Sequence, residues 1–156
     1  MLESRITILG VGNLLLQDEG VGVHAIQALQ KCSLPEGVEL IDGGTAGVDL
    51  LPYVSEAKQI IVIDAVKGGT EPGAIYRLTP EVLGQFKEQA LSLHQVGFLE
   101  VLQMAERLGK RPERTIIFGV EPQVIDWGIE LTPPVQAVLP RLVELVLEEV
   151  ERWLQE

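Results

Sequence analysis

The sequence has little cysteine, few long apolar runs and an unequal share of charge, and each shortage excludes a class of protein. Its single cysteine, Cys32, excludes an internal disulfide and a cysteine-rich zinc site. Cys32 lies near the end of the first predicted helix, where we expect a structural thiol rather than a nucleophile. No apolar stretch approaches the roughly 18 residues that a membrane-spanning helix needs.

Basic side chains are scarce. The chain has 12 Lys and Arg against 23 Asp and Glu, which gives a net charge of −11. Phosphate backbones and anionic membranes are bound through Lys and Arg, so we expect neither nucleic acid nor a membrane as a partner. At the start, Glu3 and Arg5 precede a short apolar run without a small-residue cleavage site. This start predicts a first strand rather than a signal peptide, and a cytoplasmic protein.

What is present suits one globular domain over residues 1–156, with 46% hydrophobic and 22% charged residues. Apolar runs bounded by glycine or polar residues predict strands, and apolar residues at helical spacing predict the helices between them. The predicted strands are residues 5–10, 38–42, 59–64, 74–78 and 115–120. The predicted helices cover 21–32, a short piece at 50–51, a start near Thr79-Pro80, 96–108, and a long final helix opened by Thr132-Pro133-Pro134.

The order of these elements predicts a three-layer α/β/α fold. Strands that alternate with helices form a mostly parallel sheet with helices on both faces. The turn at 68–73 is too short for a crossover helix, so 74–78 should be an antiparallel edge strand of this twisted five-stranded sheet. In the helix through 96–108, we expect Val96, Leu99, Leu102 and Leu108 on the buried face. Ligands of such sheets bind beyond the carboxyl ends of the strands.

Acidic residues gather at that predicted edge. Asp42, Asp64 and Glu121 end or follow three strands, and Asp18 and Glu19 lie in the loop after the first. Asp18 and Glu19 have an alternative explanation, because acids are favoured at a helix amino terminus by the helix dipole. Asp64 is harder to explain in this way. A carboxylate at the end of a buried central strand is costly unless it is paired, hydrogen-bonded or bound to a cation.

The chain has two histidines, His24 and His94. We expect His24 to be a partly exposed residue inside the first helix. A lone histidine such as His94 is usually structural or solvated, but beside Glu19 and Asp64 it would complete a set of nitrogen and oxygen ligands. Such a set suits a borderline divalent ion such as nickel or zinc, and three protein ligands leave coordination positions open.

Generic catalytic templates fit poorly. The glycine cluster that begins at Gly10 departs from GxGxxG at Leu15, and two acids follow where a pyrophosphate would need backbone amides. These departures disfavour the third hypothesis, a flavodoxin-like nucleotide-binding domain. GxSxG, HExxH and the paired DTG or DSG signatures are absent.

Four segments, in order, resemble the motifs of the hydrogenase maturation protease family. They are GNLLLQDEGVG at 12–22, IDGGTAGVDLL at 41–51, IDAV at 63–66 and HQVG at 94–97. The resemblance runs from about Ile6 through the final helix. It implies an aspartic-type endopeptidase with a twisted, mostly parallel sheet, in which Glu19, Asp64 and His94 bind the metal.

The resemblance also implies a task. The enzyme would recognise nickel in the precursor of a nickel–iron hydrogenase large subunit and remove the C-terminal extension of that precursor. The precursor would supply the nickel, for which cadmium or zinc could substitute in crystals. We expect a monomer with this precursor as its partner. The alternative from a different class is a nickel-checking chaperone that inspects the precursor without cutting it.

The residues that cut the peptide bond are a separate hypothesis. Asp42 or Asp18 would orient and deprotonate the attacking water as a general base. Gly43, Gly44 and Thr45, with Asn13, would lie along the substrate; ordinary turn geometry is the alternative explanation of the glycines.

Overall fold

The structure is a computed structural model that describes residues 5–86 and 93–156, without the side chains of Val48, Leu93, His94 and Val96. A five-stranded sheet with the order β2-β1-β3-β5-β4 lies at its centre. All neighbouring strands are parallel except β4 and β5, which are antiparallel. The strands are β1 Ile6–Val11, β2 Val38–Gly44, β3 Gln59–Ala65, β4 Ile75–Leu78 and β5 Arg114–Val120. The predicted sheet and its antiparallel edge strand are confirmed.

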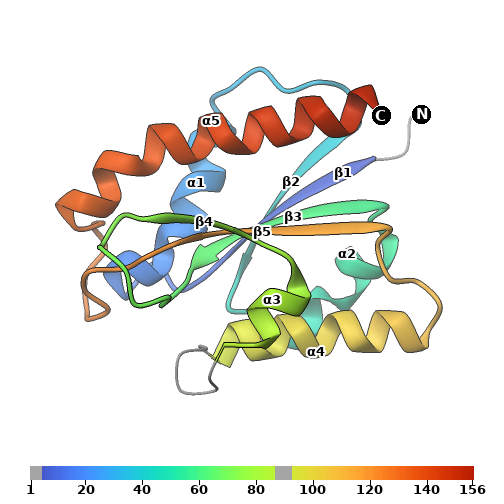
Figure 1. Ribbon diagram of the computed structural model, residues 1–156, viewed down its shortest axis with the longest axis horizontal. Helices are drawn as coiled ribbons and strands as arrows, with labels where there is room; N and C mark the ends of the chain where they lie inside the picture. The colour runs from blue at the N-terminus through green and yellow to red at the C-terminus, as the bar shows by residue number, and fades with distance from the viewer. Residues whose placement is uncertain (1–4, 87–92) are drawn as a thin grey trace.

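Helices cover both faces of the sheet (Figure 1). On one face lie α1 and α5, and on the other lie α2, α3 and α4. The α-helices are α1 Val21–Leu29, α2 Leu51–Glu56, α3 Pro80–Gly84, α4 Leu93–Arg107 and α5 Pro133–Gln155. Two short 3-10 helices precede α1 and α2, namely η1 Gln17–Gly20 and η2 Gly47–Leu50. None of the described helices is long and apolar enough to cross a membrane.

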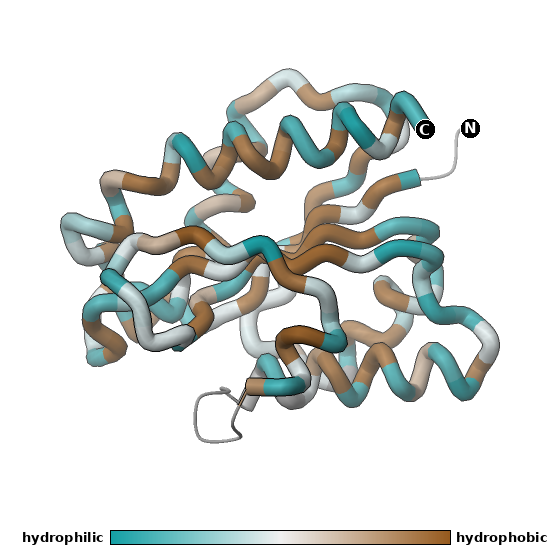
Figure 2. Tube along the Cα trace, in the orientation of Figure 1, coloured by the Kyte–Doolittle hydropathy of each residue, from teal (hydrophilic) through white to brown (hydrophobic). Residues whose placement is uncertain are grey.

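The core forms because the central strands are apolar on both sides, as Figure 2 shows by their brown colour in the middle of the molecule. Ile61 and Ile63 face α1 and α5, whereas Ile60 and Val62 face α2, α3 and α4. This alternation follows from the period of two in a strand, and it explains the run of β-branched residues in β3.

The last helix is held to the edge strand by an ion pair in which the carboxylate is buried and the guanidinium side chain is half exposed. Glu149 of α5 is buried, and its two carboxylate oxygens accept hydrogen bonds from the Arg77 guanidinium of β4 at 2.7 and 3.0 Å. Arg152 donates a further bond to Glu149. These bonds fix α5 across the antiparallel edge of the sheet.

The prediction for the buried face of α4 was partly wrong. Phe98, Val101, Leu102 and Ala105 form that face, whereas Leu108 is 60% exposed. The helix ends at Arg107, so Leu108 lies in the turn that follows it, and Gly109 takes a positive φ of 69° in that turn. The side chain of Val96 lies outside the described residues.

Candidate functional site at the carboxyl edge of the sheet

The predicted acids do lie at the carboxyl edge of the parallel strands. Asp42 pairs with Gly10 of β1, and Asp64 of β3 pairs with Gly119 of β5. Asp64 is 2% exposed, and its Oδ1 accepts a hydrogen bond from the Ala65 amide at 2.8 Å. Asp42 is exposed. At this edge, therefore, the Asp64 carboxylate is buried and the Asp42 carboxylate is open to solvent.

The loop after β1 folds back over this edge and brings Glu19 close to Asp64. Gly12 has a φ of +134°, and a Cβ atom there would lie 1.9 Å from the Glu19 carbonyl oxygen and 3.6 Å from Asp64 Oδ1. Any side chain at this position would push the Glu19 backbone away from β3. Glycine at residue 12 is therefore what allows η1 to sit against the end of β3.

Helix α4, on the face of the sheet opposite α1 and α5, also contacts the end of β3. Gln95, in the first turn of α4, donates a hydrogen bond from Nε2 to the carbonyl oxygen of Ala65. This bond ties the start of α4 to the residue that follows Asp64. His94 precedes Gln95 in the same turn, but its side chain lies outside the described residues.

The predicted metal ligands are thus partly located. Among the side chains that the structure describes, no group of three or more His, Cys, Asp or Glu could hold a metal ion. Since His94 is not among them, the described members of the proposed set are the two carboxylates of Glu19 and Asp64. The three-residue ligand set stays a prediction.

Asp18 is fully buried and points away from solvent. Its carboxylate accepts hydrogen bonds from the amides of Gln123, Val124 and Thr132 at 2.9, 3.1 and 2.8 Å, and from the Thr132 hydroxyl at 2.6 Å. Four donors occupy the lone pairs that a general base would need. These contacts favour a structural role, in which Asp18 joins η1 to the loop between β5 and α5.

Asp42 is better placed to meet a substrate. Its Oδ1 accepts a hydrogen bond from the Gly44 amide at 3.0 Å. Val38 and Leu40 of the same strand pack toward α1 and α5, so the alternation of side chains puts Asp42 on that face. Asp64 faces the other layer, where it lines a small cavity with Leu83 and Phe98.

The two carboxylates are consequently separated by the end of β1. Neighbouring strands lie about 4.8 Å apart, so the backbones at Asp42 and at the end of β3 are about 10 Å apart. A ligand that touches both Asp42 and Asp64 has to cross the edge of the sheet above β1.

Glu121, which follows β5, organises the loop between β3 and β4. Its Oε1 accepts hydrogen bonds from the amides of Gly68 and Thr70 and from the hydroxyl of Tyr76 at 2.9, 3.0 and 2.5 Å. Burial, together with the bond to Glu121, raises the pKa of the Tyr76 phenol. These contacts favour a structural role for Glu121, in which it holds the loop between β3 and β4 in place, over a role in contacting a ligand.

The residues predicted to line the substrate have mixed surroundings. Gly43 is buried, and a Cβ there would lie 2.8 Å from Leu9 Cδ1, so ordinary packing accounts for this glycine. The Asn13 side chain accepts a hydrogen bond from the Leu15 amide at 2.9 Å, while Thr45 is exposed beyond Gly44. Their role toward a substrate stays a prediction.

Sequence reasoning did not single out Gln95 and Thr132. Gln95 lies inside the HQVG segment, which could have drawn attention to it. Thr132 was predicted only to open the final helix. Its bonds to Asp18 join residues that are 114 positions apart, and no local pattern signals such a contact.

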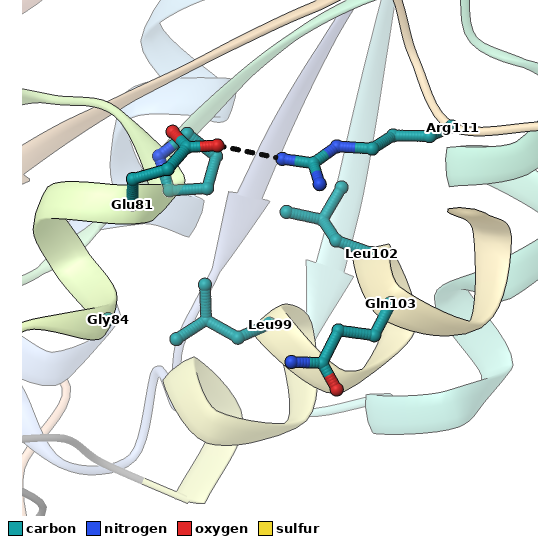
Figure 3. Close-up of a pocket in the computed structure, with 7 residues that line it drawn as sticks. Glu81, Gly84, Leu99, Leu102, Gln103 and Arg111 are labelled. Atoms are coloured by element: carbon teal, nitrogen blue, oxygen red, sulfur yellow. Dashed lines mark hydrogen bonds and ion pairs between the residues drawn. The ribbon is translucent and has the colours of Figure 1, made fainter. Parts of the chain in front are cut away.

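A separate hollow lies away from this edge. It has a volume of about 250 Å³ and lies between α3 and α4, where Arg111 forms ion pairs with Glu81 and Glu106 at 3.1 and 3.3 Å (Figure 3). None of the acids at the sheet edge lines it. We therefore place the candidate chemistry at the sheet edge.

Fold and site together define a class. This is an α/β protein with a carboxylate site at the ends of its parallel strands, and the Glu19 backbone of η1 packs against Gly12 in the loop after β1. The family model for hydrogenase maturation proteases (HycI) matches residues 23–149, so the chain belongs to that family. It is therefore an endopeptidase. Neither the non-catalytic chaperone nor the nucleotide-binding domain would have this activity.

Individual relatives agree with this assignment. The chain is 40% identical over 152 residues to the hydrogenase expression/formation protein HupD of Rhizobium leguminosarum bv. viciae, covering 96% of this chain and 75% of the relative. It is 39% identical over 145 residues to the hydrogenase 2 maturation protease of Escherichia coli K12, covering 92% and 88%.

Solved structures give the same result. The hydrogenase maturating endopeptidase HybD from E. coli superposes with a TM-score of 0.87 at 36% identity, covering 95% of this chain and 93% of the other. The NiFe hydrogenase maturation protease HybD from Thermococcus kodakarensis has a TM-score of 0.74 at 28% identity, with coverage of 94% and 98%.

Proposed function

We propose that this endopeptidase recognises nickel held in the precursor of a nickel–iron hydrogenase large subunit and removes the C-terminal extension of that precursor. Two relatives support the proposal by their names, one a hydrogenase 2 maturation protease and the other a NiFe hydrogenase maturation protease. The nickel belongs to the substrate and reaches the enzyme with it. The precursor is accordingly the partner that we expect to bind.

The observation that carries the proposal is the meeting of three elements at the end of β3. Gly12 admits η1 with Glu19, β3 ends in the buried Asp64, and Gln95 fastens the first turn of α4, in which His94 lies. We assign Glu19, Asp64 and His94 as the ligands that contact the nickel of the precursor. Two carboxylates and an imidazole suit a borderline divalent ion and leave positions for the ligands of the precursor itself.

We assign the general base to Asp42. Asp42 is exposed, whereas the Asp18 carboxylate is buried under four donors. The Asp42 carboxylate takes a proton from water, the resulting hydroxide adds to the scissile carbonyl carbon, and the proton passes to the leaving amine as the C–N bond breaks. General-base help of this kind contributes about a hundred- to ten-thousand-fold.

The separation of Asp42 from Asp64 suggests a path for the substrate. The cleaved segment would cross the sheet edge above β1, with its nickel end at Asp64 and its scissile bond at Asp42. β2 is an edge strand, so its outer backbone groups can pair with an extended peptide. Gly44 and Thr45 at the end of β2, and Asn13 in the loop after β1, would then lie beside the extension; buried Gly43 would support that turn from below.

Mass spectrometry of purified precursor tests the proposal. The precursor is loaded with nickel or left without it, incubated with the enzyme, and examined for loss of the C-terminal extension. We expect shortening only of the nickel-loaded form. Glu19→Gln and Asp64→Asn should remove this nickel dependence or abolish cleavage. Asp42→Asn should slow cleavage by about a hundred-fold or more while the precursor still co-purifies.

Glu39→Gln is the matched control for Asp42→Asn, because Glu39 is an exposed acid on the same strand. It should process the precursor at the wild-type rate. An intact precursor after prolonged incubation with the wild-type enzyme and nickel would overturn the proposal.

We further infer that the enzyme works as a monomer in the cytoplasm. Its one cysteine, Cys32, is a free thiol, which suits a reducing compartment. Cell fractionation and sedimentation velocity test these two points.

A further inference from the structure

Large apolar side chains gather on two adjoining loops beside the proposed nickel site. Trp127 is 78% exposed, Ile129 70% and Leu15 54%, and Val124 and Ile125 are exposed next to them. We call these five residues the Trp127 surface. Single exposed apolar residues are common on soluble proteins, but several on contiguous loops mark an interaction site, and tryptophan is enriched at the centres of interfaces.

The Trp127 surface is held together by backbone hydrogen bonds between its two loops. The Gln17 amide donates to the Gly128 carbonyl and the Gly128 amide donates to the Leu15 carbonyl, each at 2.9 Å. Gln17 has a φ of 50°, a conformation that costs free energy for a residue with a side chain and persists only where the surroundings enforce it.

Asp18 adds further hydrogen bonds between the two loops. Its buried carboxylate binds the amides of Gln123 and Val124 at the start of the loop that carries Trp127. The surface is therefore preformed, which lowers the entropic cost of binding a partner.

The segment after β1 that carries Leu15 and Asp18 also carries Glu19, in η1. Figure 1 shows the orange loop between β5 and α5 beside the blue segment that contains η1, in agreement with the bonds from Gln17 and Asp18. A protein that covers Trp127 and Leu15 consequently lies next to the end of β3, where the nickel of the precursor has to arrive.

The charge around the surface indicates what covers it. Asp126 and Glu130 are exposed between the apolar residues of the loop, in a chain with a net charge of −11. A complementary surface would be apolar at its centre and would carry Lys or Arg at its border.

We propose that the Trp127 surface is the docking site for the folded body of the hydrogenase large-subunit precursor, through an apolar patch bordered by basic side chains. This inference rests on the proposed function. Contacts remote from the scissile bond would hold the folded precursor in register, so that its nickel meets Asp64 and its extension meets Asp42.

Steady-state cleavage of nickel-loaded precursor tests the docking site. The double variant Trp127→Ser with Ile129→Ser should raise KM by about 30-fold or more, as loss of an interface hot spot does, with kcat within about twofold of wild type. Asp126→Lys should raise KM as well, by repelling the basic border, and it leaves the apolar side chains in place.

Leu108→Ser is the matched control. Leu108 is 60% exposed but lies after the far end of α4, so KM should stay at the wild-type value. Melting temperatures of all variants should match wild type, because the altered side chains are exposed.

Three results would overturn the docking site. A wild-type KM in the double variant and in Asp126→Lys, with the wild-type enzyme active, refutes the docking site and leaves the proposed function intact. A wild-type dimer that the double variant converts to a monomer in sedimentation would instead assign the surface to self-association. If the wild-type enzyme neither binds nor cleaves the precursor, the proposed function fails and the docking site fails with it.

Discussion

Replacing Asp18 by asparagine separates a structural role of this residue from a catalytic one. In the folded protein, Asp18 Oδ2 accepts bonds from Gln123, Val124 and the Thr132 hydroxyl, and Oδ1 accepts the Thr132 amide. An asparagine loses least when its amide nitrogen takes the place of Oδ1. The Thr132 amide then faces another N–H group and is left buried without an acceptor.

The magnitude follows from these contacts. One buried amide without a partner costs about 1–3 kcal/mol, and the remaining bonds lose the strengthening that a charged acceptor gives. We expect the free energy of unfolding to fall by about 3 kcal/mol, which lowers the melting temperature by about 6–12 °C for a chain of this size. Asp18→Ala removes every acceptor and should cost more, about 5 kcal/mol, which approaches the whole stability of a typical domain.

Thermal and urea denaturation measure this loss, and cleavage of nickel-loaded precursor is followed at a temperature where the variant is folded. Asp126→Asn is the control, because Asp126 is an exposed acid in the loop between β5 and α5 that Asp18 binds, and its melting temperature should stay within about 1 °C of wild type. If Asp18→Asn melts like the wild type but no longer cleaves, Asp18 takes part in the chemistry and the structural assignment is wrong.

The remaining predictions concern the packing of η1 and α5 and the response to pH. Gly12→Ala should displace η1, because its Cβ would meet the Glu19 carbonyl oxygen at 1.9 Å, and should lower both the melting temperature and the cleavage rate; Gly84→Ala, which meets nothing within 4 Å, should do neither. Glu149→Gln should lower the free energy of unfolding by about 1–3 kcal/mol, because it weakens the hydrogen bonds that the buried Glu149 carboxylate accepts from Arg77, and an unchanged urea midpoint would contradict this. Burial raises the pKa of Glu149, but the hydrogen bond and the charge of Arg77, together with smaller contributions from Arg152 and Trp153, outweigh burial, so the pKa lies below the usual 4.5. The stability that the Glu149 carboxylate adds is therefore complete above about pH 4.5 and disappears as the pH falls through the folded-state pKa. Burial lowers the pKa of His24 from 6.5, although a hydrogen bond to the Ile129 backbone acts in the opposite direction. The free energy of unfolding should therefore begin to fall as the pH drops below 6.5. A His24→Gln variant that keeps this first decline would refute the assignment to His24.

Much of the fold was predictable because its signals are local. The β-branched run in β3, the Thr79-Pro80 start of α3, whose Thr79 hydroxyl accepts the Val82 amide at 3.2 Å, and the short turn before β4 each depend on residues close in sequence. The acids at strand ends were predictable too, since parallel strands bring their carboxyl ends to one edge. The exposed Leu108 was not, because the exact end of a helix depends on the turn that follows.

The sequence by itself determined the order of strands and helices, the edge at which the acids collect and the motifs of the family. Glu19 was predicted as a metal ligand and Asp18 as a candidate general base, but only the tertiary structure showed what surrounds each of these two adjacent acids. The Asp18 carboxylate accepts hydrogen bonds from backbone amides of the loop between β5 and α5, more than a hundred positions away, whereas the Glu19 backbone lies against the end of β3. The same contacts join Leu15 to Trp127 in one surface. Pairings of this kind depend on which distant segments the packed sheet brings together, and no local pattern of residues encodes them.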